Sequence, residues 1–373
     1  MAVLLLLATA VQLTAWWWVY RPALTPHSSS LPTEPAAEPP PVTVIVCFHN
    51  EATHLEATLR GILSQDYPHF ELLAVDDNSA DASVAIVRYL QDRHPQLRLL
   101  QPGPTRPGKK DALTAGIQAA RHPLLLLTDA DCAPASEHWL RHMVAPLTHG
   151  NQLVLGCSPY RYRPGALAWW QRFEATQTAL QYQGFARMAH PYMGVGRNLA
   201  YHRSFFTAAG GFAAHAHHLG GDDDLLVNAH AVPSLTARIT NPAAWTYSEP
   251  TRNWWAYLRQ KVRHQSVGMH YRSRHQLVLA LLALSHGGSY LLGALLLFTP
   301  YWPLAVVLYL LRACTVVSVY RQPSVQQFAG GAPIAIGGAA SFGVGARILL
   351  GDMLLAPFYL FALLATALPP RRW

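Results

Sequence analysis

The sequence is poor in charged residues and in cysteine. Only 13% of its 373 residues are Asp, Glu, Lys or Arg, whereas 51% are hydrophobic. The four cysteines form no CxxC pair: Cys47, Cys132, Cys157 and Cys314. This spacing argues against a zinc site or a disulfide framework and fits a reducing compartment. The net charge of +8 suits an acidic partner, but no recognised nucleic-acid-binding module is present, so we expect no nucleic acid partner.

Charge is missing altogether from the start of the chain. Residues 1–20, MAVLLLLATAVQLTAWWWVY, carry no charged side chain and are long enough to cross a bilayer. They end on three tryptophans and Tyr20, as an interfacial aromatic belt does, and Arg21 follows. We expect an uncleaved transmembrane anchor; a cleaved signal peptide is the alternative, although it would want a basic start. Residues 21–41 include LPTEPAAEPPP and predict a proline-rich linker.

The last hundred residues are also strongly apolar and predict spans near 276–298, 302–320 and 348–368. The glycine-rich segment 328–346 is re-entrant, interfacial or a poor fourth span. Basic residues crowd the entrance to the first of these spans: Arg252, Arg259, Lys261, Arg263, Arg272 and Arg274. By the positive-inside rule they predict a multi-pass protein of the cell or inner membrane with its central domain in the cytoplasm. Arg371 and Arg372 agree only if 328–346 also crosses.

Between the apolar ends, strand-like runs alternate with segments of helical periodicity. The strand-like runs are VTVIVCF (42–48), HFELLAVDD (69–77), LRLLQP (97–102) and PLLLLTDAD (123–131). This alternation predicts βαβ units, and therefore an α/β domain with a mostly parallel sheet. Ligands of such sheets bind beyond the carboxyl ends of the strands, where HNE, DDNS and DAD stand in this sequence.

Asp129 and Asp131 follow an apolar strand and are separated by one residue. Two neighbouring carboxylates repel each other and lose hydration unless a cation neutralises them. A hard cation such as Mg²⁺ or Mn²⁺ takes oxygen ligands and bridges them to substrate phosphates. The D-x-D pattern therefore predicts a site for a metal–diphosphate complex, with a solvated turn as the alternative.

Two further polar groups stand near the same edge of the predicted sheet. Asp76 and Asp77 end another strand, where a carboxylate can accept hydrogen bonds from a base or a ribose. Lys109 and Lys110 open a helix, so their charges and the helix-terminal N–H groups suit a diphosphate. The alternatives are ordinary turn chemistry for the aspartates and a solvated surface for the lysines.

In this order, the motifs resemble those of family 2 glycosyltransferases of GT-A fold. The series comprises VTVIVCFHNEATHLEATLRGILSQDYPHFELLAVDDNSADAS, GKKDALTAGI, LLLLTDADC, MGVGRNLAYHRSFFTAAGGF and GGDDDLLVNAHA. The resemblance covers about residues 42–270. It implies a GT-A domain over that range, a nucleotide-diphosphate sugar as donor, and Mg²⁺ or Mn²⁺ as cofactor.

The resemblance also assigns roles to individual residues. It gives donor contacts to five of them: Asp76, Asp77, Lys109, Lys110 and Asp129. Asp131, together with Asp129, would hold the metal. In GGDDD, Asp222 and Asp223 match the family's acidic pair, which makes Asp223 the predicted catalytic base and Asp224 an additional acid. The alternative is that these acids simply favour a helix N-terminus.

Acceptor or diphosphate contacts are assigned to four residues: Asn198, Gln260, Arg263 and His264. The segment RQKVRHQ resembles the QxxRW signature of processive synthases, but His264 stands where tryptophan is expected. Trp254 or Trp255 would stack on the acceptor instead, or serve as interfacial anchors. The histidines of HAHH (215–218) lack a tight ligand pattern, and we expect a mobile loop over the acceptor site there.

These features predict a membrane-bound, inverting glycosyltransferase with a lipid-linked or other membrane-proximal glycan acceptor and membrane lipids around its spans. A carboxylate would take the proton of the acceptor hydroxyl while the nucleoside diphosphate leaves. One alternative is a processive polysaccharide synthase that also secretes its product. Another is a membrane scaffold that binds nucleotide sugar without catalysis. The sequence specifies neither the sugar nor the nucleotide.

Overall fold

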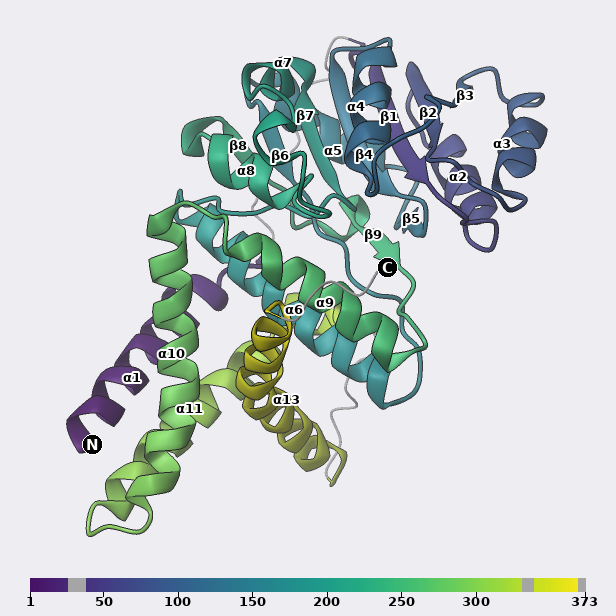
Figure 1. Cartoon of the computed structure of the whole chain (residues 1–373). Helices are drawn as coiled ribbons and strands as arrows, with labels where there is room; N and C mark the ends of the chain where they lie inside the picture. The colour runs from purple at the N-terminus through teal and green to yellow at the C-terminus, as the bar shows by residue number, and fades with distance from the viewer. Residues whose placement is uncertain (26–37, 331–338, 368–373) are drawn as a thin grey trace. The chain divides into compact units, whose positions relative to one another are not determined.

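The chain divides into two compact units in the computed structural model, which describes residues 1–25, 38–330 and 339–367. We call them the sheet unit and the helical unit (Figure 1). The sheet unit comprises residues 26–161 and 189–249, and the helical unit comprises residues 1–25, 162–188 and 250–373. By this division, residues 162–188 and 250–270 of the predicted domain 42–270 fall in the helical unit.

The sheet unit is built on seven strands in the order β3-β2-β1-β4-β7-β6-β8 (Figure 1). The strands span Val42–Phe48 (β1), Phe70–Asp76 (β2), Leu97–Leu100 (β3), Leu124–Asp129 (β4), Leu153–Leu155 (β6), Leu199–His202 (β7) and Thr236–Arg238 (β8). Pairs β1–β2, β1–β4, β2–β3 and β6–β8 are parallel, whereas β7 runs antiparallel to β4 and β6. The predicted α/β fold with a mostly parallel sheet is confirmed.

Both faces of the central strand β1 are covered by helices. Val42, Val44 and Val46 lie in one buried cluster with apolar residues of α2 (Leu55–Leu63), α3 (Ser83–Gln91) and α5 (Trp139–Thr148). The opposite face meets α4 (Lys110–Ala119) at Gly116, where an added Cβ would lie 3.1 Å from the Cγ2 atom of Ile45. The continuous apolar run of β1 thus serves both faces, as expected for a parallel strand.

Short elements complete the sheet unit. They are α7 (Arg203–Ala208), α8 (Asp224–His230) and the 3₁₀ turns Ala213–His215 (η2), Pro233–Leu235 (η3) and Pro242–Ala244 (η4). A second, two-stranded antiparallel sheet joins β5 (Cys132–Pro134) to β9 (Thr246–Ser248). Because β5 starts directly after Asp131, this small sheet fixes the loop that carries the D-x-D pattern.

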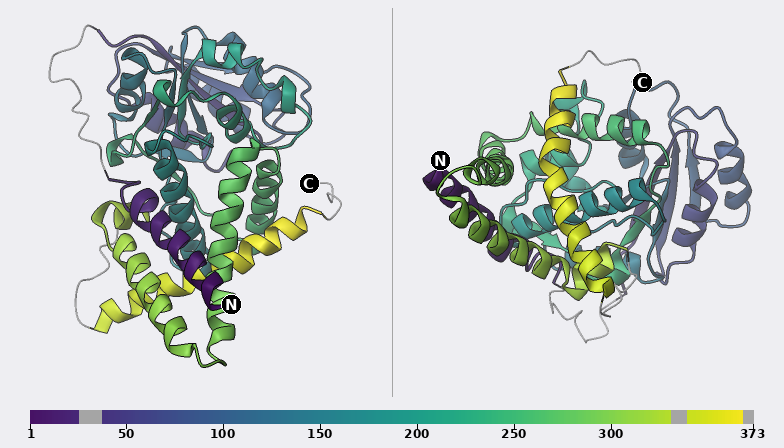
Figure 2. Two further views of the ribbon diagram at one scale, coloured as in Figure 1. Left: turned by 90° about the vertical axis from the view of Figure 1, so that its left-hand side faces the viewer. Right: turned by 90° about the horizontal axis from the view of Figure 1, so that it is seen from below.

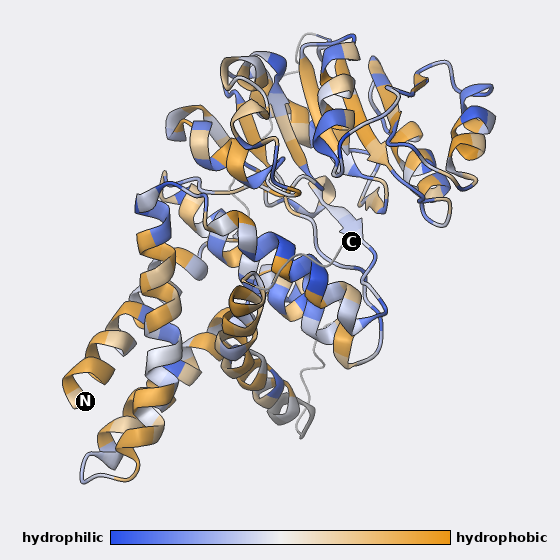
Figure 3. Ribbon diagram, in the orientation of Figure 1, coloured by the Kyte–Doolittle hydropathy of each residue, from blue (hydrophilic) through white to orange (hydrophobic). Residues whose placement is uncertain are grey.

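The helical unit contains four helices that are long and apolar enough to span a membrane: Ala2–Tyr20, Ser273–Leu296, Trp302–Tyr320 and Gly343–Ala365. Their apolar character is evident in Figure 3. In the structure they belong to α1 (Ala2–Thr14) with η1 (Ala15–Tyr20), α10 (Ser273–Leu296), α11 (Trp302–Tyr320) and α13 (Ala339–Ala365). The unit also holds α6 (Ala166–Arg187), α9 (Trp254–Gly268) and α12 (Pro323–Phe328). Within this unit, α1 packs against α10 and α11 (Figure 2).

The boundaries of two C-terminal helices differ from those predicted. The helix predicted at 276–298 begins three residues earlier, and the one predicted at 348–368 begins at Ala339. The latter helix extends toward the N-terminus through the sequence AASFGVGA. The alanines of this sequence favour a helix, whereas its glycines had argued against one. Three further predictions fall wholly or partly outside the described ranges. They concern the segment 328–346, the linker 21–41, and the pair Arg371 and Arg372.

A cluster of buried polar side chains, which we call the span cluster, contains residues from all four candidate spans. The Arg312 guanidinium donates to both carboxylate oxygens of Asp352, at 2.5 and 3.2 Å. His286 donates from Nε2 to the carbonyl oxygen of Asp352 and accepts at Nδ1 from Arg312. Tyr290 donates to Asp352, and Gln12 accepts from Arg312 at 3.5 Å. Charged groups at membrane depth are costly unless they are paired in this way.

Candidate active site

The loops after β1 and β2 are joined by side chain–backbone hydrogen bonds. His49 donates from Nδ1 to the carbonyl oxygen of Asp77 at 2.6 Å, and the Asn50 side chain accepts from the N–H of Ala80 at 2.8 Å. Asn50 and Asn78 both have positive φ, 55° and 61°, a conformation that asparagine tolerates better than most residues. The HNE and DDNS sequences therefore form one supported edge beyond the strands.

At that edge the two aspartates of DDNS have different surroundings. Asp76 is buried, and its carboxylate accepts from the N–H of Ser79 at 2.9 Å and from the Gln101 side chain at 3.0 Å. Asp77 is half-buried and accepts from the hydroxyl of Thr105 at 2.5 Å. Asp76 thus shapes the loop, whereas Asp77 keeps an oxygen atom for which no hydrogen bond is seen within the described residues.

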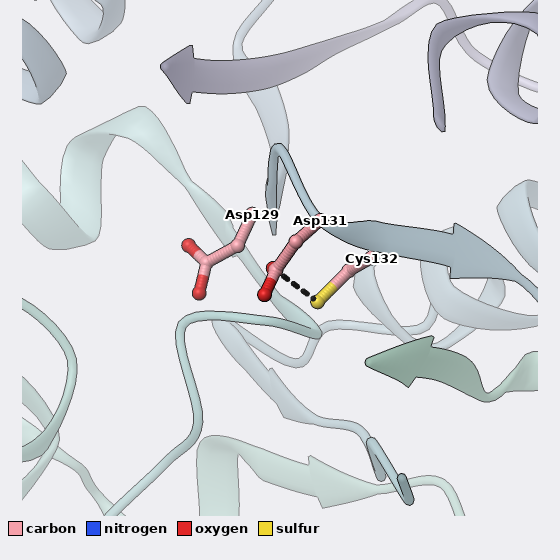
Figure 4. A group of neighbouring side chains, drawn as sticks. All are labelled: Asp129, Asp131 and Cys132. Atoms are coloured by element: carbon pink, nitrogen blue, oxygen red, sulfur yellow. Dashed lines mark hydrogen bonds between the residues drawn. The ribbon is translucent and has the colours of Figure 1, made fainter. Parts of the chain in front are cut away.

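The D-x-D carboxylates lie side by side at the end of β4 (Figure 4). Ligand atoms of Asp129, Asp131 and Cys132 all lie within 4.8 Å of one another. The Cys132 thiol is buried and donates to Asp131 at 3.3 Å, with Ser248 beside it at 2.9 Å. Two carboxylates at this spacing are oxygen ligands that fit Mg²⁺ or Mn²⁺, and the thiol next to them is a hydrogen-bond donor.

Two acids of this edge have raised pKa values. Burial, followed by the neighbouring Asp129 carboxylate, raises the pKa of Asp131. Burial, followed by Asp131 and Asp129, raises the pKa of Glu51 to about 7. Glu51 belongs to the HNE sequence after β1, and sequence reasoning did not single it out as a site residue. The strand order, which places β1 next to β4, is what brings it to the D-x-D carboxylates.

Lys109 is the cation closest to these acids. Its ammonium group contacts the Asp129 carboxylate and lies 3.8 Å from that of Asp222. Burial lowers the pKa of Lys109, but Asp129 and Asp222 raise it well above its ordinary value. Lys109 therefore stays charged and connects the D-x-D pattern to the GGDDD sequence.

Lys110 has a different partner from Lys109. It is buried, and its ammonium donates to the carbonyl oxygens of His215, His218 and Gly220 at 2.7, 2.9 and 2.6 Å. Lys110 thus anchors the histidine-rich loop that ends at the acids of GGDDD. The preceding Gly108 has a φ of +100°, and an added Cβ would lie 3.2 Å from the carbonyl oxygen of Leu219 in that loop.

Asp222 and Asp223 of the GGDDD sequence have different partners. Asp223 caps α8: one oxygen accepts from the N–H of Asp224 at 2.7 Å, and the other accepts from the N–H of Gly196 at 2.5 Å. Asp222 faces Lys109 instead. Burial and then the Asp223 charge raise the pKa of Asp222, although Lys109 opposes this. The helix-start alternative therefore describes Asp223, while Asp222 is an acid of raised pKa that faces Lys109.

The glycine–asparagine segment is fixed inside the sheet unit. Asn198 is fully buried; its side chain accepts from the indole N–H of Trp139 and donates to the carbonyl oxygens of Cys157 and Ala244. Since every polar atom of this side chain has a protein partner, Asn198 supports the scaffold, and its contact with acceptor or diphosphate stays a prediction. The adjacent Arg197 carries charge near the D-x-D pattern and was missed by sequence reasoning.

Gln260, Arg263 and His264 lie on α9 and belong to the helical unit. Arg263 and His264 are exposed, whereas the Oε1 atom of Gln260 is buried without a hydrogen-bond partner among the described residues. Between them, Lys261 pairs with the buried Glu174 of α6 at 2.5 Å. The helix that bears the QxxR sequence is thus anchored within its own unit.

Comparison with known proteins gives a consistent result. The family described as "Glycosyl transferase family 2" matches residues 43–210. Glycosyltransferase AglE of Haloferax volcanii is 31% identical over 132 residues, 35% of this chain and 43% of that protein. The probable glycosyltransferase YdaM of Bacillus subtilis is 25% identical over 246 residues, 61% of this chain and 54% of that protein. The chain thus spans about half the length of these curated relatives.

One solved structure resembles nearly the whole chain. It is the mannosyltransferase PcManGT from Pyrobaculum calidifontis in complex with GDP-Man and Mn²⁺. The two chains have a TM-score of 0.51 and 21% sequence identity, and the match covers 95% of this chain and 97% of that one. At this level of identity the likeness shows a shared fold, GT-A-like, and supports no statement about substrate.

Proposed function

We propose, from the match of residues 43–210 to glycosyl transferase family 2, that the protein is a membrane-bound, inverting glycosyltransferase. It moves a sugar from a nucleoside-diphosphate sugar to a lipid-linked or membrane-proximal acceptor in glycan or cell-envelope synthesis. The observation that carries the proposal is the convergence of Asp129, Asp131, Lys109 and Asp222 at one edge of the sheet.

Asp129 and Asp131 are the residues that would hold Mg²⁺ or Mn²⁺. The fit rests on their donor set: two carboxylates within 4.8 Å of each other, with the pKa of Asp131 raised by burial and by Asp129. Such a cation relieves this repulsion and, when bound, neutralises charge on a diphosphate. Lys109 supplies a second positive charge at Asp129 and so orients that carboxylate.

Asp222 is proposed to take the proton of the acceptor hydroxyl. Its raised pKa favours proton uptake, and the bonds to the N–H groups of Gly196 and Asp224 are made by Asp223 instead. Asp223 holds the segment of Gly196 against α8 and thereby positions Asp222. This assignment moves the base from Asp223, as predicted from the sequence, to Asp222. The reason is that both oxygens of the Asp223 carboxylate already accept backbone hydrogen bonds.

The nucleoside is proposed to bind at the edge formed by the DDNS and HNE sequences. Asp77 is the carboxylate available there, since Asp76 is buried and bonded to Ser79 and Gln101. Glu51, next to the D-x-D carboxylates, would face the ribose or the diphosphate. Its pKa near 7 makes this contact sensitive to pH in the neutral range.

Gln260, Arg263 and His264 of α9, within the helical unit, are proposed to contact the acceptor or the diphosphate. The buried, unpartnered Oε1 atom of Gln260 supports a role in binding. The candidate spans support an acceptor held in or near the membrane. A processive, secreting synthase is the weaker candidate, because His264 replaces the tryptophan of its signature. A non-catalytic scaffold would not need the acid pair at GGDDD.

The basic residues before α10 support a cytoplasmic sheet unit. A reporter fused near residue 150 should behave as cytoplasmic, and a signal from the opposite side would overturn this orientation. A second reporter after Trp373 tests whether the segment that includes residues 331–338 crosses the membrane.

The function itself is tested by nucleotide release from purified full-length protein against a panel of UDP- and GDP-sugars with MnCl₂. GDP-mannose is one member because the structurally similar mannosyltransferase was solved with GDP-Man and Mn²⁺. We expect release of a nucleoside diphosphate from one donor, increased by acceptor lipid and lost in Asp131→Asn. Equal release by wild type and by this variant would contradict the proposal.

A further inference from the structure

The backbone of residues 196–198 is held on three sides. The N–H of Gly196 donates to Asp223 at 2.5 Å. The carbonyl oxygen of Arg197 accepts from the hydroxyls of Thr128 and Thr246, at 2.8 and 2.9 Å. Because Thr128 directly precedes Asp129, these bonds fix Arg197 against the D-x-D strand. The adjacent Asn198 is buried and fully bonded, so the segment has little freedom.

The Arg197 side chain contrasts with this fixed backbone. Its guanidinium lies over the ring of Tyr160, 5.1 Å from the centroid, and makes no hydrogen bond to any described residue. Burial lowers the pKa of Arg197, but Tyr160, Cys132, Asp129 and Asp131 together raise it above its ordinary value. The guanidinium is therefore a cation in a fixed position that interacts electrostatically with the D-x-D carboxylates. All five of its N–H donors remain available for a ligand.

We propose that Arg197 binds the diphosphate of the nucleotide donor, taking the terminal phosphate group as the partner of its guanidinium. This inference rests on the proposed function of the same site. Before the donor binds, the charge of Arg197 offsets the D-x-D carboxylates. If a divalent cation neutralised those acids, the guanidinium would lose its anionic partners, and a phosphate group would replace them.

A diphosphate fits this position better than an acceptor group does. The D-x-D carboxylates are the residues that would hold a metal, and a diphosphate held with it would lie near Arg197, whose carbonyl oxygen is bonded to Thr128 directly before Asp129. The planar guanidinium matches two phosphate oxygens at once, and stacking on Tyr160 limits its motion without using any N–H group. The nucleoside end is assigned in the proposed function to Asp77, which directly follows β2.

The test is calorimetric titration of full-length protein with UDP, UMP and uridine and with GDP, GMP and guanosine, each in MnCl₂ and in EDTA. The variants are Arg197→Gln and Arg197→Lys. In MnCl₂, Arg197→Gln should bind the preferred diphosphate about 10- to 100-fold more weakly, since a hydrogen bond to a charged group is lost. Affinity for the monophosphate and the nucleoside should change little, and Arg197→Lys should recover part of the loss.

Arg161→Gln is the matched control. Arg161 also lies over a tyrosine ring, 5.7 Å from the Tyr247 centroid, but it pairs with Glu249 at 3.1 Å and not with the D-x-D acids. It should leave the affinity for diphosphate unchanged, and circular dichroism and melting should show all variants folded.

Equal weakening of diphosphate, monophosphate and nucleoside binding by Arg197→Gln would overturn the inference, because it would indicate a general role in shaping the site. Unchanged diphosphate binding together with weaker binding of the acceptor in Arg197→Gln would overturn it as well. If the wild type binds neither UDP nor GDP, the proposed donor class fails and the inference fails with it.

Discussion

The two units both bury charged side chains, but they balance them differently. In the helical unit, Arg312 and Asp352 pair through two hydrogen bonds, and His286 and Tyr290 occupy further positions around them. In the sheet unit, Asp129 and Asp131 stand side by side, and burial together with this neighbour raises the pKa of Asp131. In the first group each charge has an opposite charge of the protein as its partner, whereas in the second the repulsion between the two acids would be relieved by a bound cation.

This contrast separates structure from function within one chain. A completed ion pair stabilises one arrangement of helices against the cost of burying charge. Where acids outnumber the neighbouring cations, their mutual repulsion costs free energy. Such clusters are typical of binding sites, because a bound cation relieves the repulsion. The same logic applies to the lysines: Lys110 is bonded to three carbonyl oxygens, and Lys109 is shared between two carboxylates of the site.

Removal of the divalent cation should have the largest effect. EDTA should abolish transfer, and Mn²⁺ or Mg²⁺ should restore it, because Asp129 and Asp131 need a cation to bind a diphosphate together. The raised pKa of Asp131 also sets a pH dependence. As the pH falls, this carboxyl takes up its proton earlier than an ordinary aspartate does, so Mn²⁺ affinity should weaken first on the acid side. Full turnover in EDTA would refute the metal assignment.

The next effect in size concerns the catalytic base. Asp222→Asn should lower turnover by about 10²–10⁴-fold while leaving nucleotide affinity nearly unchanged, because general-base assistance is lost. Asp223→Asn is the matched variant. It weakens the α8 cap and the bond to Gly196, so it should lower the melting temperature as well as the turnover. A selective loss of turnover in Asp223→Asn alone would restore the assignment made from sequence.

Breaking the span cluster should cost stability and not chemistry. Asp352→Asn leaves the buried Arg312 charge without its partner, and we expect a loss of about 3–5 kcal/mol in unfolding free energy. Turnover per folded molecule should change little. The double variant Arg312→Met with Asp352→Leu removes both charges and should be less destabilised. Thermal unfolding in detergent measures both, and a double variant as unstable as the single one would be evidence against the pairing.

The smallest effect is expected at Lys110. Lys110→Met removes the ammonium that holds His215, His218 and Gly220, so the loop should become more sensitive to proteolysis. Turnover should fall by no more than about tenfold, since one charged hydrogen-bond donor is lost and Asp222 remains in place. Lys110→Arg is the control that keeps the charge. An unchanged proteolysis rate would mean that the loop is held by other contacts.

Much of the sheet unit could be predicted because its signals are local. The run VTVIVCF and the D-x-D pattern are contiguous in sequence, and the four strands expected from the sequence, β1 to β4, begin and end within a few residues of the predicted bounds, whereas the short strands β5 to β9 were not predicted. Arg197 and Glu51 could not be found in this way. Their importance comes from β1, β4 and β7 lying together in the sheet, although their residues are far apart in the chain.

The helical unit shows the same limit. Hydropathy identified its apolar segments, but a window average hides one arginine in 302–320 and one aspartate in 348–368. Only the packing of α11 against α13 shows that Arg312 and Asp352 are partners. The division of roles between Asp222 and Asp223 is also invisible in sequence, since adjacent acids are told apart by which of them caps a helix.

The most direct test of the contrast is the melting temperature of Asp131→Asn beside that of the wild type, each in EDTA and then in MnCl₂. The neutral form of Asp131 is favoured by folding, because its pKa is raised. In EDTA the variant should therefore be at least as stable as the wild type, and in MnCl₂ only the wild type should gain stability. A variant that melts well below the wild type in EDTA, or one that gains as much from MnCl₂, would contradict the account.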